Sequence, residues 1–239
     1  MKIEVWSDYA CPFCYIGKRR LEEALAQFPH KEKVEVEFKA FELDPYAARD
    51  TEFTIHELLA KKYGTSVEQA KSMSEGVGAQ AATVGLDFKF DTMIPTNTLD
   101  AHRLAKFSAA KGKEKEMTER LLSAYFVESK HLGDHETLTQ LAVEVGLDET
   151  EVRAFLNSDT FTEEVRIDEG EAQSIGVQGV PFFVVNQKYA ISGAQPTNVF
   201  AGALQKVWEE EHGRSVLQPL GTEQGAACTD SSCDMPDSK

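Results

Sequence analysis

Two cysteines near the N-terminus, Cys11 and Cys14, constrain this chain more than any other feature. Residues 2–6 alternate in character before them, as a short strand does, and apolar positions at helical spacing follow from about residue 15 to residue 28. Residues 34–41 again place their apolar side chains on one face. The chain therefore opens as strand, helix, strand, and predicts a parallel α/β unit with the cysteine pair where the helix begins.

In this setting the two-residue gap indicates redox chemistry. The first thiol lies at a helix N-terminus, where the helix dipole and free backbone N–H groups stabilise a thiolate. Pro12 suits the first helical turn, because its missing N–H is not needed there. The spacing places both sulfurs on one helix face, so Cys11 attacks a disulfide and Cys14 resolves the mixed disulfide. The alternatives are two buried structural cysteines or half of a zinc site.

A second signal lies far along the chain, at Val180 and Pro181. The continuous apolar run at residues 182–185 is typical of a buried strand, and residues 188–192 form its expected hairpin partner. The proline fits two roles. One is an ordinary strand-starting proline. The other is a cis-proline that presents the backbone of the preceding residue to an extended substrate, as in thioredoxin-type folds.

Helical patterns prevail between these two regions, from about residue 51 to residue 174. Ser66 and Gln69 form a capping box, and Asp134 is the expected N-cap of a later helix. Strand character returns only near the proline, and a last helix follows. We therefore predict three parts: an α/β domain from residues 1–48 and 175–212, an inserted helical domain at 49–174, and a flexible acidic tail at 213–239.

The charge balance excludes several classes of partner. There are 25 basic and 40 acidic residues, a net charge of −15, which repels phosphate backbones and anionic lipid. We expect neither a nucleic-acid nor a membrane partner, since no stretch approaches the roughly 18 apolar residues of a membrane span. The N-terminus also lacks the apolar region of a signal peptide. These features predict a cytoplasmic protein. Its cysteines are then expected to serve redox chemistry or bind a metal rather than form structural disulfides.

Three features together resemble the DsbA-like oxidoreductases, and within them the FrnE-type disulfide isomerase branch. They are SDYACPFCYIG at residues 7–17, GVQGVPFF at residues 176–183, and the long helical insert. The resemblance spans residues 1 to about 212. It implies a thioredoxin fold with an inserted all-helical domain. It also implies disulfide exchange with protein or small-molecule thiols, with no metal and no cofactor beyond exchange with glutathione.

The resemblance also implies roles for individual residues. Cys11 is the nucleophile, Cys14 the resolving thiol and Pro181 the cis-proline. The substrate is expected to contact the following residues: Val180, Pro181, Pro12 and Phe13. Residues 97–104 are similar to a stretch that caps the active site in this branch, which makes Asn97 and His102 candidates to face Cys11. A structural role for His102 fits equally well.

Two positions depart from the family pattern. Thioredoxin relatives often bury an acid six residues before the nucleophile, to take the proton of the resolving cysteine, and Val5 stands there instead. The proton must then go to water or to another group, with Asp8 and His102 as candidates. Strongly oxidising relatives have histidine at the position of Phe13. Because Phe13 adds no cation to stabilise the Cys11 thiolate, we expect the Cys11–Cys14 pair to have a less oxidising reduction potential. Oxidation and isomerisation both stay open as the net direction.

A second pair, Cys228 and Cys233, lies in the acidic tail with four residues between its members. Three interpretations compete: an internal redox relay that exchanges with Cys11 and Cys14, a metal-binding tail, or an exposed pair without consequence. A site of all four cysteines would bind zinc and silence the redox chemistry.

Other functions are also consistent with parts of the pattern. Kappa-class glutathione transferases and 2-hydroxychromene-2-carboxylate isomerases resemble this chain in fold and insertion, but generally carry serine at the nucleophile's position. A holdase-type chaperone with incidental thiols is a further alternative. Nucleotide-binding enzymes and serine hydrolases are not supported, because their glycine-rich and G-x-S-x-G motifs are absent. The pattern gives no oligomeric state.

Overall fold

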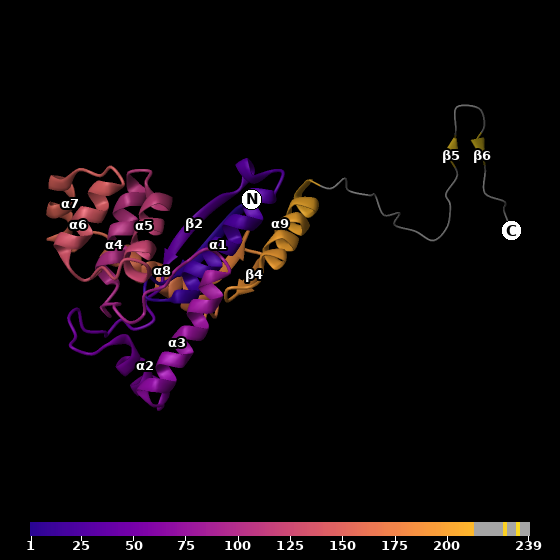
Figure 1. Ribbon diagram of the computed structural model, residues 1–239. Coiled ribbons are helices and arrows are strands. Elements are labelled where there is room, and N and C mark those ends of the chain that lie inside the picture. The colour runs from indigo at the N-terminus through magenta and orange to yellow at the C-terminus, as the bar shows by residue number, and fades with distance from the viewer. Residues whose placement is uncertain (213–226, 229–232, 235–239) are drawn as a thin grey trace.

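The computed structural model describes residues 1–212, 227–228 and 233–234 (Figure 1). A four-stranded sheet with strand order β2-β1-β3-β4 lies at its centre. Its strands are β1 (Lys2–Ser7), β2 (Glu35–Ala40), β3 (Phe182–Val185) and β4 (Tyr189–Ser192). β1 pairs parallel with β2 and antiparallel with β3, which pairs antiparallel with β4. The opening strand, helix and strand therefore form the predicted parallel unit.

Helices cover both faces of this sheet. On one face, α1 (Pro12–Gln27) and α9 (Thr197–His212) pack with Val5 and Phe183 in one hydrophobic cluster. On the other face, Trp6 packs with Ala172 of α8 (Thr162–Ser174). Since neighbouring residues of a strand point to opposite faces, burial on both sides accounts for the continuous apolar run of β3.

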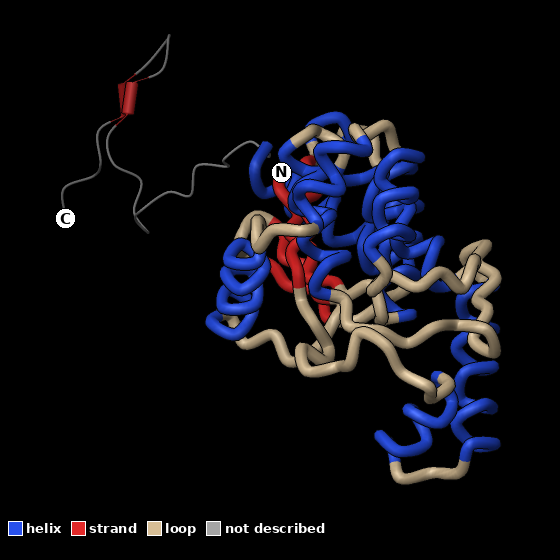
Figure 2. Tube along the Cα trace, turned by 90° about the vertical axis from the view of Figure 1, so that its left-hand side faces the viewer, coloured by secondary structure: helices blue, strands red, loops and turns tan. Residues whose placement is uncertain are grey.

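A helical region separates β2 from β3 in the sequence. Besides α8 it contains α2 (Ile55–Tyr63), α3 (Val67–Ala82), α4 (Leu99–Ala110), α5 (Glu114–Phe126), α6 (His135–Glu144) and α7 (Glu149–Leu156). Figure 2 shows the helices α2 and α3 extending away from the sheet. The expected caps are present: Ser66 and Gln69 form a capping box, and Asp134 accepts from the backbone of the first turn of α6. A short 3-10 helix (Lys31–Lys33) precedes β2.

The helix α1 belongs to two hydrophobic cores. Its Leu21 and Ala24 pack in the sheet cluster. Its Tyr15 and Ile16 pack instead in a large cluster made mostly by the inserted helices, where Leu121 of α5 is one of the buried members. The start of α1, which carries the cysteine pair, is therefore held by the insertion, and the later part of the helix by the sheet.

Asp168 of α8 joins the insertion to the sheet. Its carboxylate accepts a hydrogen bond from the backbone of Ala40 at 2.8 Å and forms ion pairs with Lys39, at 3.4 Å, and Lys106. Its backbone carbonyl accepts from the Trp6 indole at 2.9 Å. Asp168 is buried, and each of its oxygens has a partner, as a buried charge requires. These contacts make the joint between α8 and the sheet rigid.

The expected thioredoxin fold with an inserted helical domain is thus confirmed. In the tail, β5 (Ala227–Cys228) pairs antiparallel with β6 (Cys233–Asp234), and Cys228 lies opposite Cys233 in the register. None of the helices within the described residues is long and apolar enough to cross a membrane.

Candidate active site

Cys11 is the N-cap residue of α1, and Pro12 occupies the first helical position. The Cys11 backbone N–H donates to the carbonyl of Asp8 at 3.1 Å, which closes a turn between β1 and the helix. This turn places the Cys11 sulfur at the positive end of the helix dipole. Cys11 itself is buried, whereas Phe13 is 37% exposed. Phe13 therefore presents an apolar surface beside a thiol that is largely covered.

The Cys11 thiol faces the loop before β3. Its sulfur donates to the carbonyl oxygen of Val180 at 3.5 Å, and the Val180–Pro181 peptide bond is cis. Two segments about 170 residues apart in the sequence therefore meet at the reactive atom. The pairing of β3 with β1 brings them together, since β1 leads directly into the cysteine turn.

Cys14 is 2% exposed, and both thiols of the pair are free. Burial raises the pKa of the Cys14 thiol well above its ordinary value, and the hydrogen bond and charge of Cys11 raise it further. The backbone N–H of Asp8 donates to the Cys14 sulfur at 3.4 Å and opposes this shift, as does Ser7. Cys14 is therefore a neutral thiol at physiological pH and must lose its proton before it can attack.

The carboxylate of Asp8 is buried and fully engaged. One oxygen accepts from the backbone of Leu43 at 2.8 Å, and the other from Ala10 at 3.2 Å. That second oxygen also lies 3.4 Å from Nε2 of His102, which reaches it from α4. Burial alone would raise the pKa of Asp8, but the hydrogen bond and charge of His102, with help from Leu43 and Thr98, lower it overall. His102 therefore contacts Asp8, the residue whose backbone binds the Cys14 sulfur.

Asn97 contacts a different acid. Its amide donates to Glu42 at 3.3 Å and to the carbonyl of Pro45 at 3.2 Å. The Glu42 side chain is completely buried, and its other oxygen accepts from Arg166 at 2.6 Å. Burial raises the pKa of Glu42 although Arg166 and His102 act against it. His102 thus contacts Asp8 beside the cysteine pair, whereas Asn97 contacts Glu42. Within the described residues, neither side chain makes a hydrogen bond with Cys11, whose sulfur bonds to Val180.

Sequence reasoning missed Glu42. Its burial and its ion pair depend on Arg166 of α8, 124 residues further along the chain. A lone glutamate after a strand carries no local signal for such a partner. The burial follows from the way α8 packs on β2, which only the tertiary structure reveals.

A cavity of about 440 Å³ opens beside Asp8. Asp8, Ala10, Thr98 and Tyr125 are among its lining residues, together with mostly apolar side chains from the segment after β2 and from α2. Tyr46, at 96% exposure, lies on the same segment. The cavity connects the Asp8 region with the surface.

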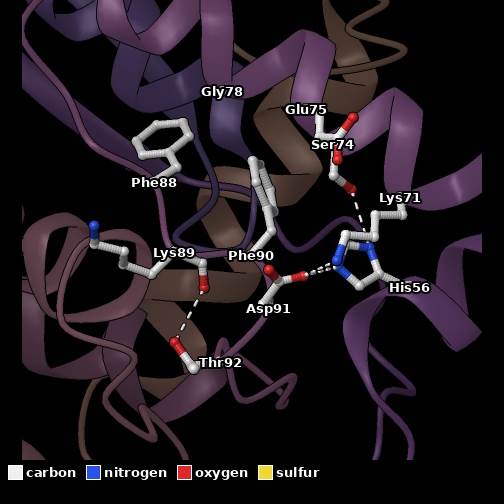
Figure 3. A pocket seen from close by; sticks show the side chains of 10 residues that line it. All are labelled: His56, Lys71, Ser74, Glu75, Gly78, Phe88, Lys89, Phe90, Asp91 and Thr92. Carbon is white, nitrogen blue, oxygen red and sulfur yellow. Dashed lines mark hydrogen bonds and ion pairs between the residues drawn. The ribbon is translucent and has the colours of Figure 1, made fainter.

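A separate cavity of about 370 Å³ holds Ser74, His56 and Asp91 (Figure 3). His56 lies 3.1 Å from Asp91 and 3.4 Å from the Ser74 hydroxyl. The hydroxyl donates to the carbonyl of Ala70 within α3, and Ser74 is 3% exposed. It is therefore not an available nucleophile, and the cluster joins α2, α3 and the segment before α4. The cavity shares no lining residue with the one beside Asp8.

The tail pair is described only by its backbone. Cys228 and Cys233 are directly opposite in an antiparallel pair of two-residue strands. Residues opposite each other in such a pair have Cα atoms roughly 4.5–5.5 Å apart, a separation that a disulfide spans. The connecting residues 213–226 and 229–232 lie outside the described part of the chain, as does the rest of the predicted tail.

A thioredoxin fold with two free thiols at the start of α1, facing a proline loop, defines the class of thiol–disulfide oxidoreductases. Comparison with known proteins agrees. The model of the DSBA-like thioredoxin domain matches residues 2–205, and the chain belongs to this family. The family resemblance predicted from the cysteine and proline motifs is therefore confirmed at the level of the DsbA-like proteins.

Individual relatives cover most of the chain. The uncharacterised protein YwbO of Bacillus subtilis (strain 168) is 30% identical over 204 residues, which are 84% of this chain and 94% of YwbO. The crystal structure of the probable DsbA oxidoreductase SCO1869 from Streptomyces coelicolor is similar with a TM-score of 0.84 and 41% identity, over 99% of this chain and 100% of that one.

A structure of 2-hydroxychromene-2-carboxylate isomerase has the same fold with a TM-score of 0.67, over 88% of this chain and 98% of that one. Its sequence is only 15% identical. The class of enzyme that we weighed as the alternative therefore shares the architecture, and the fold alone does not separate the two functions.

Proposed function

We propose that this protein exchanges disulfides with protein or small-molecule substrates through Cys11 and Cys14. The observation that carries the proposal is the position of the Cys11 sulfur. It lies at the N-terminus of α1 and 3.5 Å from the carbonyl oxygen of Val180. A thiolate at a helix N-terminus is a good nucleophile and a good leaving group. The backbone beside it offers hydrogen bonds to an extended substrate.

The environment of Cys14 orders the steps. Cys14 is buried and its pKa is raised, so it stays protonated while Cys11 attacks the substrate disulfide. The attack forms a mixed disulfide with Cys11 and releases one substrate thiol. Cys14 then attacks the Cys11 sulfur, which releases the second substrate thiol and leaves a Cys11–Cys14 disulfide. Run in reverse, the same steps donate a disulfide to a substrate dithiol.

Substrate recognition involves four residues around the sulfur: Val180, Pro181, Pro12 and Phe13. The carbonyl of Val180 accepts from the Cys11 thiol, and Phe13, two residues after Cys11, has an exposed ring for apolar contact. This arrangement suits an extended peptide that makes both a backbone hydrogen bond and an apolar contact near its cysteine. Glutathione, itself a short extended peptide, fits the same requirements.

Several finer assignments stay predictions. They are membership of the FrnE-type branch, isomerase activity, a cytoplasmic location, the three-part domain division and the absence of a cofactor or metal. The uncharged Phe13 between the cysteines supports a potential less oxidising than that of relatives with histidine there. Such a potential favours isomerisation or reduction over oxidation.

For the tail we propose an internal relay in which Cys228 and Cys233 exchange with the Cys11–Cys14 pair. Cys228 and Cys233 lie opposite each other in the antiparallel register, which supports a disulfide between them. The stretch from residue 213 to residue 227 contains 15 residues, which at full extension span on the order of 50 Å.

The alternative is a glutathione-dependent transferase or isomerase of the kappa or 2-hydroxychromene-2-carboxylate type. The shared fold is compatible with it. The cysteine pair argues against it, because such enzymes activate glutathione without forming a disulfide of their own.

The deciding experiment is a titration of the full chain in glutathione buffers, with alkylation and peptide mass spectrometry for each cysteine pair. We expect Cys11 and Cys14 to interconvert between dithiol and disulfide at a potential between about −120 and −270 mV. A Cys14→Ser variant should accumulate the mixed disulfide on Cys11. Failure of the parent to form the Cys11–Cys14 disulfide would overturn the proposal in favour of the transferase. If the relay is correct, the tail pair equilibrates only when Cys11 is intact.

A further inference from the structure

The resolving step needs a group that takes the proton of Cys14, and the usual position does not provide one. Val5 stands six residues before Cys11 and is buried in the hydrophobic cluster between the sheet, α1 and α9. It has no proton-accepting atom. Because Cys14 is itself buried, with a pKa held well above the ordinary value, bulk water is a poor acceptor. Another group near the sulfur must serve.

Asp8 contacts that sulfur through its backbone, beside the side chains of Ser7 and Cys11. Its backbone N–H donates to Cys14 at 3.4 Å, so the carboxylate extends from a residue already bound to the reacting atom. Its carboxylate oxygens are occupied by His102, by the Ala10 and Leu43 backbones and by Thr98. His102 is also fixed, because its ring lies 4.8 Å from the ring of Tyr9. The acid and the imidazole are thus one preorganised unit.

This unit has access to solvent that Cys14 lacks. Asp8 and Thr98 line the cavity of about 440 Å³, and the cavity opens at the surface beside Tyr46. A proton taken up at Asp8 can therefore leave without crossing the hydrophobic core. General bases act within hydrogen-bond reach of the proton or through one water. Asp8 lines the cavity, so a proton held by its carboxylate can exchange with solvent there.

We propose that the Asp8–His102 pair accepts the proton of the Cys14 thiol during resolution and passes it to solvent through this cavity. The inference rests on the proposed thiol–disulfide exchange. Asp8 contacts the reacting sulfur, whereas His102 acts through Asp8 and is a positioning residue.

The step balances as follows. The S–H bond of Cys14 breaks and its proton goes to the Asp8 carboxylate, which His102 holds in place. The Cys14 sulfur forms a bond with Cys11, and the bond between Cys11 and the substrate sulfur breaks. The substrate leaves as a thiolate and takes a proton from water. With glutathione disulfide as the substrate, two protein thiols are oxidised and one glutathione disulfide is reduced to two molecules of glutathione.

Other titratable groups face the pair and must be separated from it. Tyr9 and Tyr125 lie close enough to Asp8 that burial and its charge raise their pKa values far above the ordinary one, so both stay neutral. Glu42 acts on His102 from the segment after β2, and Arg166 of α8 pairs with it. Of these neighbours, Glu42 is therefore the one whose titration must be controlled.

The test follows the two steps separately in the full chain. Reduced protein is mixed with excess glutathione disulfide and quenched in acid at successive times. Peptide mass spectrometry then counts glutathionylated Cys11 and the Cys11–Cys14 disulfide. The variants are Asp8→Asn, which keeps the backbone N–H on Cys14 but removes the charge, and His102→Gln. The pH is varied from 6 to 10, and a Glu42→Gln variant controls for the neighbouring acid.

Two matched variants control for structural damage. Asp168→Asn changes another buried, hydrogen-bonded acid, at the joint between α8 and the sheet. His56→Gln changes another buried histidine paired with an aspartate, in the separate cavity of Figure 3. Neither residue contacts a cysteine. Their resolution rates report what loss of packing alone does.

We expect Asp8→Asn to slow resolution on the order of 100-fold at pH 7, a typical share for a general base, while glutathionylation of Cys11 changes less than about threefold. The deficit should shrink as the pH rises towards 10, because hydroxide increasingly removes the Cys14 proton without help from Asp8. Resolution at the parental rate and pH profile in Asp8→Asn would overturn the inference, as would equal slowing in the matched variants. If the parent itself forms no Cys11–Cys14 disulfide, the proposed function has failed, which is a distinct result.

Discussion

Gly17 of α1 lies so close to Pro181 that a β-carbon added to the glycine would be 3.0 Å from Cγ of the proline ring. The same carbon would be 3.2 Å from the ring of Phe183 in β3. This contact lets α1 approach the loop before β3. Since Cys11 starts the same helix and Val180 precedes the same proline, the absence of a side chain at Gly17 helps to set the distance between the reactive sulfur and the carbonyl opposite it.

A methyl group at this position should therefore affect both stability and reactivity. We expect Gly17→Ala to lower the free energy of unfolding by about 1–3 kcal/mol, as overpacking does, and to slow the attack of Cys11 on glutathione disulfide. Urea denaturation and the quenched assay measure the two effects. The control is Gly76→Ala in α3, where a β-carbon meets nothing within 4 Å. The Gly76→Ala variant should have a free energy of unfolding about 0.5–1 kcal/mol higher than the parent. Equal behaviour of the two variants would contradict this account.

The raised pKa of Cys14 predicts a loss of stability in alkali. The unfolded thiol ionises near its ordinary pKa of about 8.5, while the folded thiol keeps its proton to higher pH. Between the two values the folded state binds more protons, so the free energy of unfolding falls by up to about 1.4 kcal/mol per pH unit. Below the pKa of the unfolded thiol, the stabilisation that comes from the protonated Cys14 is fully present.

The measurement is urea denaturation of the reduced protein from pH 7 to pH 10. Tyrosines also titrate in the upper part of this range, so the informative quantity is the difference from Cys14→Ser. That variant should show a shallower decline. Parallel curves for the two proteins would mean that Cys14 has an ordinary pKa in the folded state.

The local motifs made much of this arrangement predictable. Cys11, Cys14 and Pro181 each carry a signal within a few residues: a strand before, a helix after, or an apolar run beside them. The caps at Ser66 and Asp134 were predictable for the same reason, because a cap depends on the next three or four residues.

What the sequence could not predict depends on contacts between distant segments. His102 was a candidate, but its partner Asp8 lies 94 residues away, so the pair emerges only when α4 packs over the cysteine turn. The role of Gly17 depends on Pro181, which no helical pattern encodes. Buried polar groups are the hardest case, since a polar residue in a sequence predicts exposure unless its partner is known.

Asp168 should be essential to the joint between the insertion and the sheet. Asp168→Ala leaves Lys39 and Lys106 without their buried partner and the backbone N–H of Ala40 without an acceptor. We expect a loss of about 3–5 kcal/mol, the usual result when one member of a buried ion pair is removed. Glu171→Gln is the comparison, because Glu171 pairs with Lys39 from a half-exposed side chain. It should change stability by less than about 1 kcal/mol. Similar losses in both would show that burial at Asp168 is unimportant.

Asn97 should act on Glu42 rather than on the thiols. Asn97→Ala removes one of the donors to this buried carboxylate, and we expect a loss of about 1–3 kcal/mol in urea denaturation. The attack of Cys11 on glutathione disulfide should stay within about threefold of the parent. Asn157→Ala, which removes an exposed amide bonded to the Arg153 carbonyl, should be nearly neutral. A tenfold slower attack in Asn97→Ala would instead favour the contact with Cys11 that the family resemblance implies.

The two cores that share α1 make the chain hard to divide. Tyr15 and Ile16 complete the core of the insertion, and Leu21 and Ala24 that of the sheet, so melting either region strips apolar cover from the same helix. The two regions are thereby coupled into one cooperative unit, and calorimetry should record a single heat-absorption peak. Excision of the helical segment would leave a helix with an uncovered apolar face. The inserted helices are therefore part of the structure that holds the reactive cysteines, and they cannot be removed as an independent domain.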